Sequence, residues 1–203
     1  MARFKAVALD MMGVVYPIGD DLRGLIIPFL KSEGCDLPDQ AFIDAYRTCY
    51  KGGGNAEFFW QSLGYTPPYD EIESLLLHEY QLTFGAVEFL EALRVQDVPV
   101  FSLSNDVAEW ASRRRKLHGI DDYFSGAVIS GEIGVPKPEP AIYQALIDRL
   151  PCAPEECLFV DDRPSNLDGA AREGLATVLF GAAGHETHDA AADFEALTAY
   201  VGL

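Results

Sequence analysis

The sequence predicts an α/β protein, with a Rossmann-like, doubly wound parallel sheet and a small α-helical domain inserted into it. Three observations predict this class. After residue 85, short apolar runs alternate with helix-like segments, which is the order of βαβ units. Between residues 20 and 85 the apolar residues follow helical spacing, and no convincing strand occurs. One apolar run precedes this helical segment, so the core begins before the insert.

The first strand is expected at residues 4–9, within FKAVALDMMGVVY. This run is long enough for a strand buried on both faces and too short for a helix. Asp10 then lies at the carboxyl end of a parallel strand, where open α/β sheets bind ligands. Met12 follows two residues later, at a position where a second acid would be expected.

The insert is expected at residues 18–84, and the core at residues 1–17 and 85–203. Helical spacing in the insert predicts helices near 22–30, 42–49, 58–63 and 72–80, separated by turn-like glycines and by a Pro-Pro pair. In the core, strands are expected at 98–103, 127–129, 157–160 and 176–180. Core helices are expected at 86–95, 107–117, 141–150, 165–173 and 194–201, with a loop at 182–192.

Composition limits the possible partners. With 32 acidic and 15 basic residues the net charge is -17, which argues against nucleic acid and anionic membranes as partners. The basic run at 113–116 is interpreted as a solvated helix face. The four cysteines show neither CxxC pairing nor zinc-like spacing and are expected to be reduced thiols. No signal peptide or membrane span is expected, so we expect a soluble, cytoplasmic protein.

Polar residues follow the expected core strands at four places. These are Asp10, the Ser104-Asn105-Asp106 cluster, Lys137 ahead of a helix, and the Asp161-Asp162 pair. Each has a structural alternative, since Ser and Asp cap helices and a loop lysine is often a surface residue. Together at one sheet edge, three carboxylates, a lysine and a hydroxyl suit Mg²⁺ and a phosphoryl group.

These motifs resemble those of the haloacid dehalogenase superfamily, in the branch with a helical cap. FKAVALDMMGVVY resembles the first motif, VFSLSN the second, GVPKPEPAIYQ the lysine motif and LFVDDRPSNLDGAAREGL the fourth. The resemblance implies a phosphatase-like hydrolase in which Asp10 attacks phosphorus and an aspartyl-phosphate is then hydrolysed. It also implies the following site: catalytic Asp10, Ser104 and Lys137; Mg²⁺ bound by Asp10, the Met12 carbonyl, Asp162 and Asp161; and Asn166 in support.

Candidate substrate contacts are Asn105, Met12, Gly13, Tyr16 and Trp60, with Phe58, Phe59 and Gln61 as further cap residues. The alternative for the aromatic residues is that they pack the cap. The expected substrate is a small phosphorylated metabolite, and the protein is expected to be a monomer or a homodimer.

Met12 is a departure from most phosphatases of this superfamily, in which an aspartate at this position moves the leaving-group proton. General acid–base help contributes about 10²–10⁴ in rate, so a phosphatase that obtains its proton elsewhere is the preferred interpretation. One alternative is a weak or inactive member that binds a phospholigand. Another is different chemistry, such as phosphonate cleavage with Lys31 or Lys51, or dehalogenation. The Asp161-Asp162 pair argues against a dehalogenase, because similar dehalogenases lack it.

Overall fold

A computed structural model describes residues 2–203. Its centre is a six-stranded sheet in the order β3-β2-β1-β4-β5-β6, in which every pair is parallel. This confirms the predicted α/β class. The strands are β1 (Ala6–Leu9), β2 (Val100–Ser104), β3 (Phe124–Ile129), β4 (Cys157–Asp161), β5 (Ala176–Phe180) and β6 (Ala190–Ala191).

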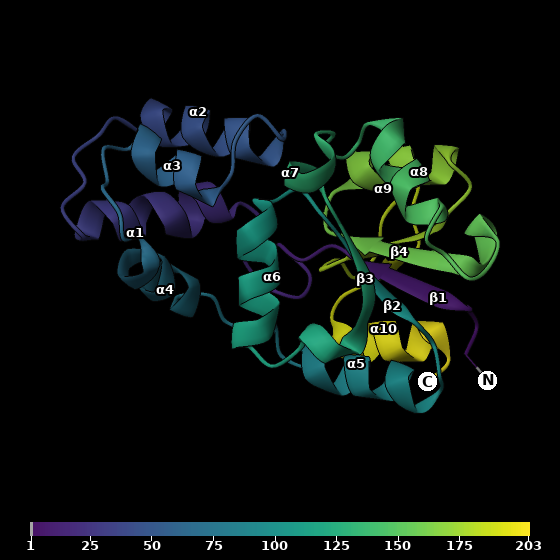
Figure 1. The fold of residues 1–203 in the computed structure, drawn as a ribbon. Coiled ribbons are helices and arrows are strands. Elements are labelled where there is room, and N and C mark those ends of the chain that lie inside the picture. Colours follow the sequence, from purple (N-terminus) through teal and green to yellow (C-terminus); the bar gives the residue numbers. More distant parts are fainter. Residues whose placement is uncertain (1) are drawn as a thin grey trace.

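Helices cover both faces of the sheet, as Figure 1 shows. Alternate residues of β1 belong to different apolar clusters, Val7 and Leu9 on one face and Ala6 and Ala8 on the other. The first face packs against α5 (Ala86–Val95), α6 (Ala108–Leu117) and α10 (Phe194–Val201), and the second against α8 (Pro140–Ile147) and α9 (Pro164–Arg172). Burial on both faces explains why the central strands read as continuous apolar runs.

The helical insert lies beside the sheet, next to α6 and α7 (Ser130–Ile133) (Figure 1). The chain leaves and re-enters the core along adjacent linkers, because the Thr83 amide and hydroxyl donate hydrogen bonds to the carbonyls of Val15 and Val14. The insert contains a π-helix at Leu22–Ile26, α1 (Ile27–Ser32), α2 (Asp39–Tyr50), α3 (Ala56–Ser62) and α4 (Asp70–His78). All four helices expected from its periodicity are therefore present.

The elements that the sequence did not predict are all short. Strand β6 lies within the segment expected to be a loop, and Leu179 and Phe180 of β5 pair with its two residues. Helix α7 and the 3₁₀ turns at Asp121–Tyr123 and Pro154–Glu156 were also not expected. These elements have two to four residues, which is too short for a periodic pattern to be recognised.

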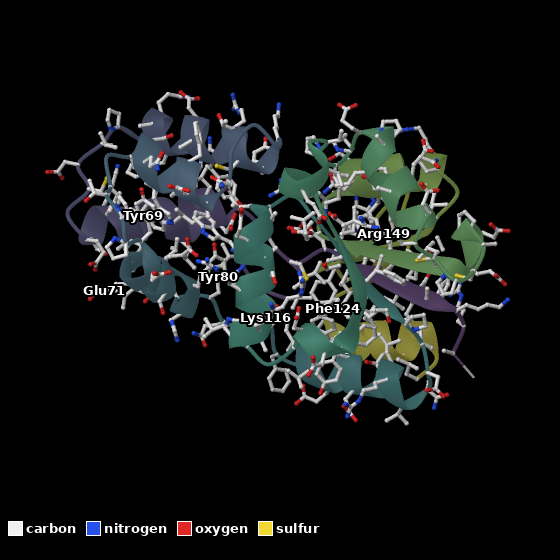
Figure 2. All side chains as sticks on the ribbon, viewed as in Figure 1. Tyr69, Glu71, Tyr80, Lys116, Phe124 and Arg149 are labelled. Atoms are coloured by element: carbon white, nitrogen blue, oxygen red, sulfur yellow. The ribbon has the colours of Figure 1, made fainter. Side chains whose placement is uncertain are left out.

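The interpretation of the basic run on α6 as a solvated helix face is correct for Arg113 and Lys116, which are exposed, and wrong for the two arginines between them. Arg114 is 1% exposed and Arg115 is 8% exposed, and both carry acidic partners. Arg114 forms an ion pair with the buried Asp106, and its guanidinium carbon lies 4.5 Å from the centre of the Tyr80 ring. Figure 2 shows Tyr80 beside α6, where the insert meets the core. Composition could not reveal this burial, because the partners come from elsewhere in the chain.

Within residues 2–203 no helix is long and apolar enough to cross a membrane. The four cysteines are free thiols, as expected, and are Cys35, Cys49, Cys152 and Cys157.

We predict that Arg114→Ala destabilises the fold by about 3–5 kcal/mol, because it leaves the Asp106 carboxylate buried without its cation. Lys116→Ala is the matched control, since Lys116 is an exposed residue of the same helix and its loss should cost less than about 0.5 kcal/mol. Urea unfolding curves measure both changes. Equal midpoints for the two variants would contradict a structural role for the buried pair.

Candidate active site

Asp10 directly follows β1 and points into the carboxyl edge of the sheet. Its amide donates to the carbonyl of Val160, at 2.9 Å, which continues the ladder to β4. Its Oδ1 accepts a hydrogen bond from the Met11 amide at 2.7 Å and lies 2.9 Å from the Lys137 ammonium. Both contacts fall on one oxygen, so Oδ2 carries no hydrogen bond from the described residues.

The Lys137 ammonium is buried and uses all three of its protons. It lies 2.9 Å from Asp10 Oδ1 and donates to Asp161 Oδ2 at 2.7 Å and to the Leu103 carbonyl at 2.8 Å. One cation thus ties together the ends of β1, β2 and β4. The Lys137 loop is itself held by Asn105, whose side chain accepts from the Lys137 amide at 2.7 Å and donates to its carbonyl at 3.0 Å.

Asp161 is saturated with hydrogen bonds. Its Oδ1 accepts from the Arg163 amide and from Asn166, and its Oδ2 accepts from Lys137 and from Asn166, all within 3.0 Å. A carboxylate offers about four lone-pair sites, so Asp161 has none left for a direct metal bond. Asn166 steadies the lysine through this carboxylate.

Asp162 has the opposite character. Its Oδ1 is buried and accepts no hydrogen bond from the described residues, and its nearest cation, Arg163 Nε, is 3.8 Å away. The carboxylate lies against Gly13 and Gly19. A Cβ atom on Gly13 would collide with Asp162, and one on Gly19 would come within 2.6 Å of it. Two glycines therefore leave the space that this acid occupies.

The three carboxylates fit a divalent cation. One oxygen each from Asp10, Asp161 and Asp162 lies within 4.8 Å of the others, and among residues 2–203 only the Lys137 ammonium pairs with two of the three acids. Hard oxygen ligands with one or two protein carboxylates are what Mg²⁺ uses together with substrate phosphate. The orphaned Oδ1 of Asp162 is the atom best suited to direct ligation, and Oδ2 of Asp10 is a second carboxylate oxygen that carries no hydrogen bond from the described residues.

The electrostatics of the site also favour a cation. Burial raises the pKa of Asp10 well above its usual range, and the Lys137 charge only partly opposes this. Burial and the charge of Asp161 likewise raise the pKa of Asp162. Burial by itself would lower the pKa of Lys137, but Asp10 and Asp161 outweigh it and raise that pKa. A bound divalent ion reverses the penalty on the carboxylates.

Ser104 ends β2 at the same edge of the sheet. Its side chain is fully buried, and its Oγ lacks a hydrogen-bond partner among the described residues. A buried hydroxyl without a partner costs free energy unless a ligand supplies one. A phosphoryl oxygen would satisfy it.

A cavity of about 200 Å³ opens above Asp10 and Lys137. Asn105, Met12 and Asn166 also line it, from the core side. The insert contributes its first residues, 19–23, and one face of α2, made by Ile43, Tyr46, Arg47 and Tyr50. The cavity therefore lies between the insert and the carboxyl edge of the sheet.

Three of the five expected substrate contacts, Gly13, Tyr16 and Trp60, do not line this cavity. Gly13 lies against the Asp162 carboxylate instead. Trp60 is fully buried in the insert, where its Nε1 donates to Glu73 at 2.8 Å and its ring packs against Phe59 and Trp110. Tyr16 is 1% exposed and packs against Tyr80. Their burial corrects this part of the expected site and favours the packing alternative. Phe58 and Gln61 are exposed but also lie outside the cavity lining.

The cavity-facing side of α2 was missed. The helix expected at 42–49 rested on the spacing of Phe42, Ala45, Tyr46 and Cys49, and all four residues are buried. Ile43, Arg47 and Tyr50 occupy the next face, with Tyr46 at the border. Counted from Ile43, these residues are spaced by three, four and seven positions, which places them on one side of a helix. The spacing does not show which side of the helix faces the core, so it did not identify them as cavity residues.

A family model described as haloacid dehalogenase-like hydrolase matches residues 4–174. Among curated proteins, the chain is 31% identical over 100 residues to phosphoserine phosphatase from Thermus thermophilus, a match that covers 49% of this chain and 40% of the relative. The chain spans less than half the length of the first curated relatives that it matches. Phosphatases and an (S)-2-haloacid dehalogenase are both among these relatives.

Solved structures show the same fold. A HAD phosphatase from Thermococcus onnurineus superposes with a TM-score of 0.75 at 24% identity, covering 98% of each chain. A mutant HAD family enzyme from Bacteroides thetaiotaomicron, in complex with magnesium and inorganic phosphate, has a TM-score of 0.70 at 22% identity, covering 91% of this chain and 97% of that one. At these identities the likeness establishes the fold alone.

We predict that Gly13→Ala destabilises the protein more than Gly64→Ala does. Both glycines have a positive φ, 87° and 82°, so each substitution carries a backbone strain of about 1–3 kcal/mol. Only Gly13 faces a neighbour that blocks a Cβ, the Asp162 carboxylate, whereas nothing lies within 4 Å at Gly64. Thermal unfolding of the two variants isolates the cost of the collision, and equal losses would contradict the close packing of Asp162.

Proposed function

This chain belongs to the haloacid dehalogenase-like hydrolases, and we propose that it is a magnesium-dependent phosphatase that acts on a small phosphorylated metabolite. The observation that carries this proposal is the convergence of Asp10, Asp161 and Asp162 on one point beside the Lys137 ammonium. Such an arrangement supplies what phosphoryl transfer needs, which is positioning and neutralisation of negative charge.

In the proposed mechanism Asp10 is the nucleophile. Its Oδ1 is held by Lys137 and the Met11 amide, which leaves Oδ2 to attack phosphorus. The bond from phosphorus to the ester oxygen breaks, and the leaving alkoxide takes a proton from water, from the insert or from the substrate itself, since Met12 has none to give. Water then attacks the aspartyl-phosphate on Asp10, which releases phosphate and restores the carboxylate.

Mg²⁺, when bound, neutralises phosphoryl charge and brings the phosphate to the nucleophile despite their like charges. Asp10 and Asp162, with the carbonyl of Met12, are the proposed ligands, and Asp161 acts through a water or by holding Lys137. We assign Ser104 and Lys137 to the phosphoryl oxygens, since a charge-assisted bond there stabilises the transition state. Asn105 positions the Lys137 loop through two backbone hydrogen bonds.

The insert is proposed to act as a cap, with residues 18–84 closing over a core of residues 1–17 and 85–203. A cap excludes water from the reacting groups and supplies contacts to the part of the substrate beyond the phosphate. The cavity of about 200 Å³ supports a small substrate.

The main alternative is a weak or inactive member that binds a phospholigand, and Met12 favours it. The Met12 side chain lines the cavity next to the nucleophile and has no titratable proton. Phosphonate cleavage is less well supported, because Lys31 and Lys51 are exposed and do not line the cavity. Dehalogenation is also less well supported, because a carbon–halogen substrate needs no acidic pair such as Asp161-Asp162.

We predict that Asp10→Asn lowers p-nitrophenyl phosphate hydrolysis by about 10⁴-fold or more, because an amide cannot replace the nucleophilic carboxylate. EDTA should abolish wild-type activity, and excess Mg²⁺ should restore it. The control is Asp122→Asn, at an exposed carboxylate outside the site, which should keep full activity. Full activity in Asp10→Asn with unchanged thermal unfolding would mean that the nucleophile is a different residue.

We predict that Met12→Asp accelerates hydrolysis of alkyl phosphates by about 10²–10⁴ and that of p-nitrophenyl phosphate much less, because only the alkoxide needs a proton to leave. The measurement is the ratio of kcat/KM for the two ester types. Met12→Leu keeps an apolar side chain of similar size and should keep the wild-type ratio. An equal gain on both esters would count against a missing acid at this position.

A further inference from the structure

The cavity above Asp10 is rich in basic residues for so acidic a protein. Four of the 15 basic residues of the chain line it, namely Arg23, Arg47, Lys137 and Arg163, against three of the 32 acidic residues. Two further acids, Asp161 and Asp162, do not line the cavity; Asp161 pairs with Lys137, and Asp162 is a proposed metal ligand. The cavity is therefore richer in basic residues than the protein as a whole.

Three of the four cations already have partners. Arg23 pairs with Asp20 at 3.1 Å, and Lys137 lies within hydrogen-bond distance of Asp10 and Asp161. Arg163 donates to the Gly19 carbonyl and lies 3.8 Å from Asp162. Lys137 has no donor left, and Arg23 and Arg163 are both drawn toward residues 19 and 20 at the start of the insert.

Arg47 is different from the other three. Within residues 2–203 its guanidinium forms no ion pair and no side-chain hydrogen bond. It projects from the cavity-facing side of α2, one turn after Ile43 and beside Tyr46, with Tyr50 one turn further on. The wall opposite Asp10 thus has apolar and aromatic surface with a single cation that lacks a protein partner.

We propose that the substrate carries a second anionic group, a carboxylate or a phosphate, which Arg47 binds while the scissile phosphate lies at Asp10. This inference rests on the proposed phosphatase function and names the class of leaving group. A guanidinium presents a planar pair of donors that matches a carboxylate or a phosphate in a bidentate contact. A neutral polyol leaving group offers no such partner.

The overall charge makes this contact selective. At a net charge of -17 the protein repels dianionic ligands, so a substrate with two anionic groups needs a compensating cation at each end. Lys137 and the proposed Mg²⁺ serve the scissile end, and Arg47 serves the other. A hydrogen bond to a charged group is worth about 10-fold to 100-fold in a binding or rate constant.

Matched pairs of phosphate esters test the proposal, because in each pair a hydroxymethyl or hydroxyl group replaces the second anion. The pairs are 3-phosphoglycerate with glycerol 3-phosphate, 6-phosphogluconate with sorbitol 6-phosphate, and fructose 1,6-bisphosphate with fructose 6-phosphate. The first two test a carboxylate at two lengths, and the third tests a phosphate. For each pair we measure the ratio of kcat/KM, anionic over neutral, with Mg²⁺ present.

The wild type should prefer the anionic member of at least one pair by about tenfold or more. Arg47→Met should lower that ratio by about 10-fold to 100-fold, and Arg47→Lys should retain part of it. Arg94→Met is the matched control, because Arg94 is an exposed arginine on α5 that pairs with Glu91 away from the cavity, and the ratio should not change. No preference in the wild type, or an unchanged ratio in Arg47→Met, would overturn the proposal.

A binding experiment separates this proposal from the proposed function. Calorimetric titration of Asp10→Asn, with and without Arg47→Met, measures the dissociation constant of each ester. The ratio of these constants within a pair reports the same preference and requires no turnover. If no ester is hydrolysed but the binding ratio depends on Arg47, the phosphatase function fails and the anion site stands. If esters are hydrolysed without preference, and binding shows none, the anion site fails and the phosphatase function stands.

Discussion

The site depends on the buried ammonium of Lys137. Its three protons reach Asp10, Asp161 and the Leu103 carbonyl, so it joins the ends of three strands at the centre of the sheet. Burying this cation would be costly without those partners, and burying the acids would be costly without the cation. The pair of aspartates and the lysine therefore require one another, and their geometry follows from the order of the parallel strands.

A second buried cation connects the core to the insert. Arg114 of α6 pairs with Asp106, two residues after the end of β2, and its guanidinium lies over the ring of Tyr80, near the end of the insert. Tyr80 in turn donates to Asp21, at the start of the insert, at 2.8 Å. Through these contacts the insert rests on the segment that directly follows β2 and its last residue, Ser104.

Met12 and Arg47 line the same cavity, Met12 from the core and Arg47 from the insert. On the floor, Met12 lies next to the proposed nucleophile and has no titratable proton. The proton for the leaving group must then come from the substrate, from water or from the insert. On the wall, Arg47, whose guanidinium has no partner within the described residues 2–203, lines the same cavity. In the proposed phosphatase, selectivity would then come from the charge of the leaving group, and the rate from how readily that group departs.

The sequence by itself determined the α/β class, the five longer strands, the helical insert and the clustering of Asp10, Ser104, Lys137 and Asp161-Asp162. It could do so because apolar runs mark buried strands and parallel strands deliver their carboxyl ends to one edge. Only the tertiary structure decided that Arg114 is buried, that Tyr16 and Trp60 pack away from the cavity, and that Arg47 lines it. Helical periodicity tells which residues share a face, but the partner of that face is set by how the insert packs on the core, through contacts between residues far apart in the chain.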